Sequence, residues 1–309
     1  MIRRRFLQAA GVAAAWSAFP RAALAQAAGA LASGRPSATA QGAAFLRAAH
    51  QLLDAPPVLP DAFALEVIGR EARAALEADP QRYDTRRTLR AFVALRSRYA
   101  EDRLAEAVAR GVRQYVLLGA GLDTFSFRNR HPGLHIFEVD HPATQRWKRQ
   151  RIGEASLAVP QALRFAPVDF ERETLAEGLR RAGFIEREPA FFSMLGVAIY
   201  LTRPALTETL SYVASRPAGS EIVFSYTLPD EYLTSAQKTA RERSAARVAG
   251  IGEPWLSYYD PPALAADLRE IGFGEVRDLD PREANQRYFS ERADGLRVSG
   301  SGRMMSARV

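Results

Sequence analysis

The 309-residue chain contains no cysteine. This absence excludes disulfide bonds, thiolate metal ligands, cysteine nucleophiles and thiol-based redox switching in a single step. Histidine is scarce as well, and the four histidines show neither the HExxH pattern nor another metal-binding spacing, so the sequence predicts no metal site and argues against a zinc hydrolase. They are His50, His131, His135 and His141.

Lysine is nearly absent too, because Lys148 and Lys238 are the only two lysines among 42 basic residues. The formal net charge is +7, but the first 25 residues hold four arginines and no acid, which leaves 38 basic against 35 acidic residues, or +3, for the rest. A nucleic-acid-binding protein needs basic clusters on one face, so we expect a small-molecule substrate and no nucleic-acid partner. The hydrophobic content of 47% is ample for a folded core. The sequence does not indicate the oligomeric state.

The N-terminus resembles an export signal. Residues 1–25 combine the basic string Arg3-Arg4-Arg5-Phe6-Leu7-Gln8, an alanine-rich apolar stretch and a small-residue cleavage site at Ala23-Leu24-Ala25. The string is typical of a twin-arginine signal, which predicts a periplasmic protein. The alternative is a basic disordered tail on a cytoplasmic protein. The apolar stretch is too short to span a bilayer permanently, so we expect no stable membrane insertion.

The rest of the chain is predicted to be one domain of the α/β class. Residues 26–40 are small and flexible in composition, which is typical of a linker, and residues 41–309 form the domain. Residues 41–110 are predicted to form N-terminal helices, at Ala43–Leu53, Asp61–Ala78 and Thr85–Arg110. After them, short apolar runs alternate with helix-like stretches, which indicates a parallel sheet. The polar residues 230–258 are a candidate lid. The expected strands are Tyr115–Leu118, His135–Val139, Leu163–Val168, Ala190–Leu195, Glu221–Tyr226, Glu275–Leu279 and Arg303–Val309.

A glycine turn follows the first expected strand. Gly119, Ala120 and Gly121 come directly after it, and glycine brings backbone N–H groups close to a ligand without a Cβ in the way. Asp140 ends the second strand, 21 residues after Gly119, where an acid can accept hydrogen bonds from both hydroxyls of a ribose. The alternative is that Asp140 caps the helix starting at Pro142. Together these features favour an adenosine-type cofactor.

The turn does not fit a dinucleotide. The GxGxxG pattern needs a third glycine where this chain has Thr124, and Asp123 places a carboxylate where a diphosphate would approach. S-adenosylmethionine carries a sulfonium and an amino acid tail instead of phosphates, so it tolerates both residues. The sequence therefore predicts a methyl-donor site, with an NAD(P)-binding Rossmann oxidoreductase as the alternative and a non-catalytic nucleotide-binding module as a third hypothesis.

Six segments resemble one family, the bacterial S-adenosylmethionine-dependent methyltransferases related to leucine carboxyl methyltransferases. The likeness extends from about Ala43 to Val309 and implies a Rossmann-like class I methyltransferase fold. That fold has a seven-stranded, mainly parallel sheet, helices on both faces and an N-terminal helical extension, with its last strand antiparallel between two neighbours. The segments are VLLGAGLDTFSFR, FEVDHPATQRWKRQ, APVDFE, FFSMLGVAIYLTRPALTETLSYVAS, PAGSEIVFSY and DGLRVSG.

The resemblance also implies residue roles. Gly119 and Gly121 would line the methionine portion, Asp140 would hold the ribose, and Asp169 with Phe170 would flank the adenine. Arg96 matches the arginine that binds the methionine carboxylate, with Arg98 as an alternative two residues away. Without the resemblance, Asp169 reads as a helix cap and Arg96 as part of a solvated helix face. One departure is Leu195-Gly196, because leucine carboxyl methyltransferases place a glutamate there to contact the donor's amino group.

The acceptor is less well defined by the sequence. A carboxylate acceptor is already ionised at neutral pH, whereas a phenol or alcohol needs a general base, and no histidine occurs where such a base is expected. We therefore expect O-methylation of a small carboxylate- or hydroxyl-bearing metabolite. Tyr200, Tyr226 and Trp255 are candidate substrate residues, although aromatic residues at such positions more often belong to the core.

Overall fold

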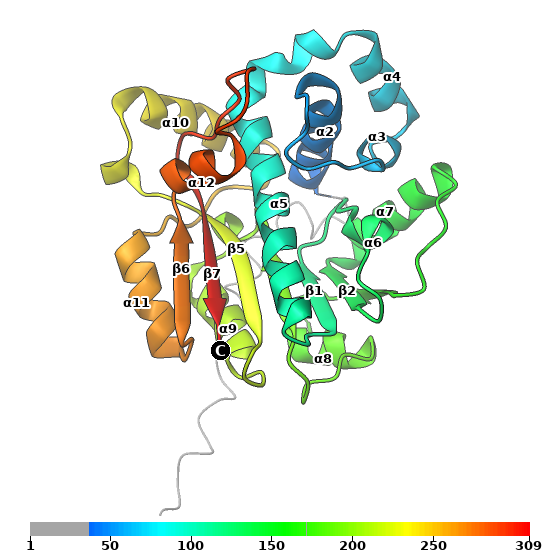
Figure 1. Ribbon diagram of the computed structural model, residues 1–309, viewed down its shortest axis with the longest axis vertical. Coiled ribbons are helices and arrows are strands. Elements are labelled where there is room, and N and C mark those ends of the chain that lie inside the picture. The colour runs from blue at the N-terminus through cyan, green and yellow to red at the C-terminus, as the bar shows by residue number, and fades with distance from the viewer. Residues whose placement is uncertain (1–36, 171) are drawn as a thin grey trace, which may run out of the picture.

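The computed structural model describes residues 37–170 and 172–309, so the predicted signal and most of the predicted linker lie outside the described residues. Seven strands form one sheet in the order β3-β2-β1-β4-β5-β7-β6, with only β7 antiparallel to its neighbours. This confirms the predicted sheet, and Figure 1 shows its twist. The strands are β1 (Gln114–Leu118), β2 (His135–Asp140), β3 (Leu163–Pro167), β4 (Phe191–Met194), β5 (Glu221–Thr227), β6 (Glu275–Leu279) and β7 (Gly302–Arg308).

The strand order reverses direction at β1. Strand β1 pairs in parallel with β2 on one side and with β4 on the other, so the crossovers leave the sheet in opposite directions. In open α/β sheets this switch point opens a crevice at the carboxyl ends of the strands. The glycine turn directly follows β1, and Asp140 is the last residue of β2. Both therefore lie at the crevice.

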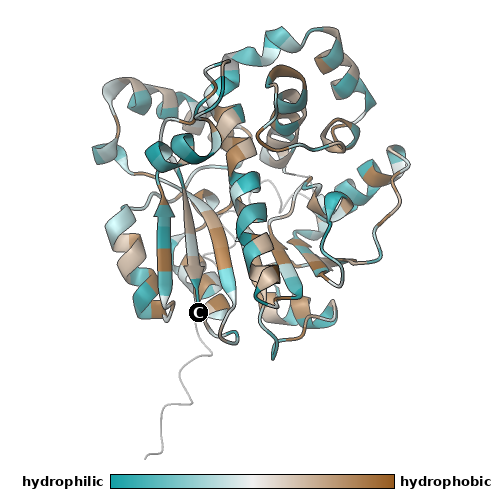
Figure 2. Cartoon of the chain, viewed as in Figure 1, coloured by the Kyte–Doolittle hydropathy of each residue, from teal (hydrophilic) through white to brown (hydrophobic). Residues whose placement is uncertain are grey.

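Helices cover both faces of the sheet, as predicted. One face packs against α8 (Leu175–Arg181), α9 (Arg203–Ala214) and α11 (Pro261–Ile271). The other packs against α5 (Arg87–Ala109), the short α6 (Phe125–Arg128) and α12 (Pro281–Tyr288). Apolar residues concentrate on the central strands (Figure 2), which are buried on both faces as expected for a parallel sheet. A further helix, α7 (Pro142–Glu154), follows β2.

The N-terminal helices differ in detail from the prediction. Helix α2 (Ala38–Leu53) begins five residues earlier than expected, because the Ser37 side chain accepts a hydrogen bond from the Ala40 N–H and caps it. The single helix expected over residues 61–78 is two, α3 (Ala64–Val67) and α4 (Arg70–Ala78). Gly69 separates them with a φ of 90°, and a Cβ there would lie 2.5 Å from the Arg151 guanidinium. A 3₁₀ segment, η2 (Pro80–Arg86), precedes α5.

The candidate lid contains one exposed helix. Residues 230–258 form η4 (Asp230–Tyr232), α10 (Ser235–Gly250) and an irregular segment, and α10 buries none of its side chains. Among the described residues, no helix is long and apolar enough to cross a membrane.

Candidate active site

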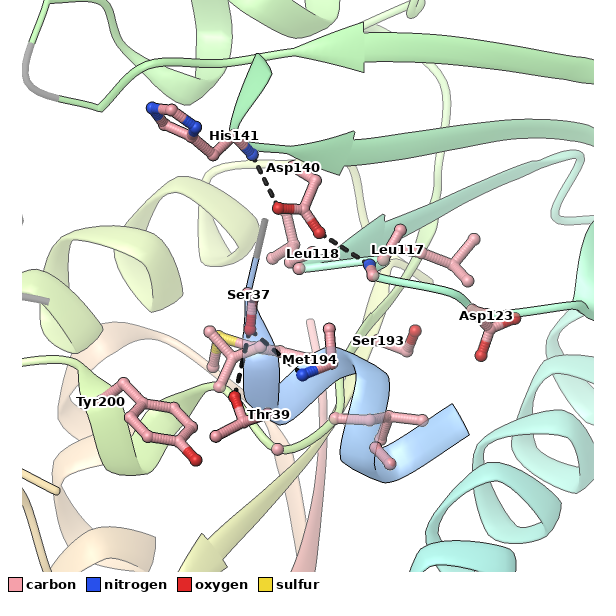
Figure 3. Close-up of a pocket in the computed structure, with 18 of the residues that line it drawn as sticks. Ser37, Thr39, Leu117, Leu118, Asp123, Asp140, His141, Ser193, Met194 and Tyr200 are labelled. Carbon is pink, nitrogen blue, oxygen red and sulfur yellow. Dashed lines mark hydrogen bonds between the residues drawn. The ribbon is translucent and has the colours of Figure 1, made fainter. Parts of the chain in front are cut away.

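A cavity of about 280 Å³ opens at the switch point, beyond the carboxyl ends of β1, β2 and β4. All seven residues predicted to bind the cofactor lie on its walls: Arg96, Gly119, Ala120, Gly121, Asp140, Asp169 and Phe170. They come from helix α5, the turn after β1, the end of β2 and the loop after β3. Residues distant in sequence therefore meet at one place, shown in Figure 3.

The glycine turn is a cradle that side chains would fill. Gly119 has a φ of 71° and Gly121 a φ of 49°, in the left-handed region that favours glycine. A Cβ on Gly119 would lie 2.4 Å from Cγ2 of Val197, and one on Gly121 would lie 3.0 Å from Cβ of Ala40. Both glycines are thus required by backbone conformation and by close approach, which leaves the space above the turn open.

The Asp140 carboxylate faces the turn. Its Oδ2 accepts the Gly121 N–H at 2.6 Å and its Oδ1 accepts the His141 N–H at 2.7 Å, as the dashed lines in Figure 3 show. Burial raises the pKa of Asp140, while these two N–H donors oppose that shift. The alternative role as a helix cap does not hold, because His141 caps α7 by accepting the Ala143 N–H at its Nδ1.

Arg96 is a partly buried cation, and its buried Nε atom has no hydrogen-bond partner among the described residues. Burial and, to a lesser extent, the nearby charge of Arg47 lower the pKa of Arg96 to about 10, so Arg96 stays protonated at neutral pH. Its guanidinium lies against Gly196, where a Cβ would come within 2.3 Å of Nη1. Arg98 is not on the cavity wall and instead donates to Asp102 at 2.8 Å. Of these two arginines, Arg96 therefore lies on the cavity wall and Arg98 does not.

Asp169 and Phe170 lie on the wall that follows β3. The expected alternative, that Asp169 caps the next helix, does not hold, because Thr174 caps α8 with a complete capping box. Arg172 lies 3.5 Å from the Asp169 carboxylate but is itself largely exposed. Phe170 packs against the apolar core on one side and borders the cavity on the other. This aromatic face beside a carboxylate is suited to an adenine ring with an exocyclic amine.

Ion pairs beneath the glycine turn hold it to the N-terminal helices. Asp61 accepts a hydrogen bond from the Thr124 hydroxyl at 2.5 Å and pairs with Arg128, which also forms two hydrogen bonds to Glu101. Arg47 of α2 donates to the Leu122 carbonyl and lines the cavity. The contacts of Asp61 with Thr124 and of Arg47 with Leu122 join segments more than 60 residues apart in sequence. Sequence analysis missed Arg47 because its helix gave no motif.

One side of the cavity, which we call the mouth, is built from the start of α2 and the segment after α10. Glu253 is only 6% exposed and accepts hydrogen bonds from the Ala38 and Thr39 N–H groups at 2.8 and 3.2 Å, and from the side chains of Ser37 and Thr39. A carboxylate at the start of a helix satisfies N–H groups that have no partner within the helix. Ser37, Thr39 and Glu253 all line the cavity. No local pattern in the sequence indicated this contact.

The three candidate substrate residues lie in different places. Tyr200 lines the cavity, and its hydroxyl accepts a hydrogen bond from the Trp255 indole at 3.3 Å, so Trp255 supports the wall without being part of it. Tyr226 lies elsewhere. It is 2% exposed, its hydroxyl donates to Asp278 at 2.7 Å, and this contact joins β5 to β6 across β7. The expectation that Tyr226 lines the acceptor pocket is therefore not met.

Comparisons with known proteins identify the family of the chain. A family model described as leucine carboxyl methyltransferase matches residues 40–214. The YktD protein of Bacillus subtilis (strain 168), named as an S-adenosyl-L-methionine-dependent methyltransferase, is 34% identical over 289 residues, covering 84% of this chain and 93% of YktD. A protein of Mycobacterium tuberculosis (strain ATCC 25618 / H37Rv) with the same type of name is 32% identical over 209 residues, covering 65% and 68% of the two chains.

A solved structure from Thermobifida fusca YX, described as a methyltransferase, has a TM-score of 0.50 at 18% identity, covers 82% of this chain and 98% of its own, and shows the fold alone. The family match and the identity to YktD decide the assignment: the chain belongs to the leucine carboxyl methyltransferase family. It is an S-adenosylmethionine-dependent methyltransferase, and the dinucleotide oxidoreductase and the non-catalytic module are not retained.

The residues present fit the donor. The glycine cradle leaves room for it, Arg96 supplies an unpartnered cation for a carboxylate, and Asp140 supplies acceptor oxygens for hydroxyls. Among the described residues no group of three or more His, Asp or Glu side chains could hold a metal ion.

Proposed function

We propose that the protein transfers a methyl group to an oxygen of a small metabolite, with a carboxylate as the preferred acceptor and a hydroxyl as the second. The proposal rests on one observation. Of the described residues on the cavity wall, His141 is the only histidine, and its Nδ1 already accepts the Ala143 N–H. A hydroxyl acceptor needs a general base, whereas a carboxylate is ionised without one.

The position of the mouth supports a small acceptor. Glu253 and the first turn of α2 lie over the cavity and hold each other through four hydrogen bonds. A compact acid that enters beside Tyr200 can reach the donor without displacing the mouth.

The chain contributes mainly by positioning. S-adenosylmethionine supplies an electrophilic methyl carbon on a sulfonium. Asp140, Arg96 and the glycine cradle fix the two ends of the donor, and alignment of reacting groups is worth about 7–11 kcal/mol in favourable intramolecular cases.

A pH profile tests the acceptor class. The enzyme is incubated with a donor that carries a labelled methyl group and, in separate reactions, with small carboxylic acids, phenols or alcohols. We expect the label mainly in methyl esters. For a carboxylate acceptor, the rate should stay nearly constant between about pH 6 and about pH 9, because no base has to lose a proton. A rate that rises about tenfold per pH unit over that range would instead identify a hydroxyl acceptor. Transfer to amines alone would contradict O-methylation.

We also propose that residues 1–25 direct export to the periplasm. The order of arginines, apolar stretch and small-residue site supports this. Mass spectrometry of protein from its host should find Gln26 at the N-terminus. An intact N-terminus near Met1 would favour a cytoplasmic enzyme.

A further inference from the structure

Four carboxylates line the cavity, and two of them are already engaged by hydrogen bonds from the protein. Both oxygens of Asp140 accept backbone N–H groups, and Glu253 is occupied by the start of α2. Asp169 lies after β3, at the wall shared with Phe170. The fourth carboxylate, Asp123, lies at the opposite side of the view from Tyr200 in Figure 3.

One carboxylate oxygen of Asp123 is fixed by a backbone hydrogen bond. Its Oδ1 accepts the Phe125 N–H at 2.7 Å, which fixes the side chain within the turn that follows Gly121. Burial alone would raise the pKa of Asp123, but the charges of Arg47, Lys148 and Arg128 outweigh burial and lower it. The group is therefore an anion at neutral pH. No hydrogen bond to Oδ2 is found in the described part of the chain.

Arg96 lines the same cavity and carries the opposite charge. Asp123 raises the pKa of Arg96 through space, so the two groups lie within electrostatic reach of each other. Even so, no ion pair joins them among residues 37–170 and 172–309, although surface pairs of this kind are common elsewhere in the chain. A separated anion and cation on the wall of one cavity match the ammonium and carboxylate of an α-amino acid.

The residue after β4 differs from the pattern of the family that the sequence resembles, and the donor's amino group lacks an acidic partner there. Leu195 stands where leucine carboxyl methyltransferases carry the glutamate that contacts the donor's amino group. Leu195 and Gly196 both line the cavity, so no acid reaches the ammonium from this side. An ammonium without an anionic partner in a buried site loses the stabilisation that hydration gives it in water.

We propose that Asp123 binds the α-ammonium of the donor, and that Asp123 and Arg96 together recognise its amino acid zwitterion. The proposal rests on the S-adenosylmethionine site and does not depend on the nature of the acceptor.

Calorimetric titration with three ligands tests the proposal. S-adenosylhomocysteine carries both charges, its deamino analogue lacks the ammonium, and methylthioadenosine lacks the whole amino acid portion. Asp123→Asn should weaken S-adenosylhomocysteine about 10- to 100-fold, as expected for loss of a charge-assisted hydrogen bond. Affinity for the other two ligands should be unchanged. Equal weakening of all three ligands, or no change for any, would overturn the proposal.

Two further variants separate binding from support of the turn. Asp61→Asn perturbs the ion pairs under the same turn but not the cavity wall, and it should leave the ratio of the affinities for the three ligands unchanged. Leu195→Glu, added to Asp123→Asn, should restore tight binding of S-adenosylhomocysteine by returning an acid to the side where relatives have one. If wild-type protein binds methylthioadenosine as tightly as S-adenosylhomocysteine, the zwitterion is not recognised and the proposal fails while the adenosine site stands.

Discussion

The two halves of the cavity are built in different ways. The donor half consists of strand ends and the turns that follow them, so β1, β2 and the core of the sheet position Gly119, Gly121 and Asp140. The mouth consists of the start of α2 and the segment around Glu253, which lie more than 210 residues apart in sequence. The sheet holds the first half, whereas a few hydrogen bonds hold the second.

This difference suggests a division of labour. Segments with few apolar contacts open at a lower free energy than a sheet core does, and ligand-gating elements usually come from such segments. The donor half should therefore determine how tightly the donor binds, and the mouth should determine how fast ligands enter and leave. The following variants are ways to break or sharpen this contrast.

The largest effect is expected at Asp140. Asp140→Ala removes the acceptor oxygens for the ribose and releases the Gly121 and His141 N–H groups. Affinity for S-adenosylhomocysteine should fall about 100-fold or more, as expected when charge-assisted hydrogen bonds are lost, while the circular dichroism spectrum is retained. As a control, Asp280→Ala removes the N-cap of α12, costs about 1 kcal/mol of stability and should leave the affinity unchanged. Normal affinity in Asp140→Ala would remove the ribose role.

The glycine cradle allows a matched pair. Gly119 and Gly133 have φ values of 71° and 73°, but a Cβ on Gly133 would meet nothing within 4 Å. Alanine at either position should cost about 1–2 kcal/mol of stability for the left-handed conformation. Gly119→Ala should cost about 1–3 kcal/mol more, because its Cβ meets the stiff side chain of Val197, and it should weaken donor binding.

Denaturant unfolding and calorimetry measure the two quantities. Adding Val197→Ala to Gly119→Ala should recover part of the stability. If both alanine variants lose the same stability and Gly119→Ala binds S-adenosylhomocysteine normally, the close approach at the cradle does not matter.

The smallest equilibrium effect is expected at the mouth. Glu253→Gln keeps the shape of the side chain but removes the charge that satisfies the start of α2, which is worth about 1 kcal/mol. The melting temperature should fall by about 2–4 °C. S-adenosylhomocysteine should dissociate several-fold faster, with little change in its dissociation constant, because the mouth affects entry and exit alike.

Stopped-flow fluorescence measures that rate, and the exposed Glu231→Gln is the control. A large loss of affinity with an unchanged dissociation rate would show that the mouth belongs to the donor half.

The same contrast explains what the sequence could predict. The donor half was predictable because Gly119, Gly121 and Asp140 have a fixed spacing along a strand–turn–helix–strand unit. The mouth was not, because the contact of Glu253 with α2 depends on how two distant segments pack. Tyr226 was assigned to the wrong environment because its place near the carboxyl end of β5 does not reveal which face its side chain takes. Its neighbour Ser225 accepts the Gly196 N–H at 2.7 Å, and successive strand residues point to opposite faces.

The antiparallel strand has a consequence for biosynthesis. Strand β6 pairs only with β7, so it has no strand neighbour until residues 302–308 have left the ribosome. The residues on the cavity wall lie between Ser37 and Glu253 in the sequence, so all of them emerge before β7. A nascent chain can therefore form its ligand pocket before β7, the strand that pairs with β6 at the edge of the sheet, has been translated.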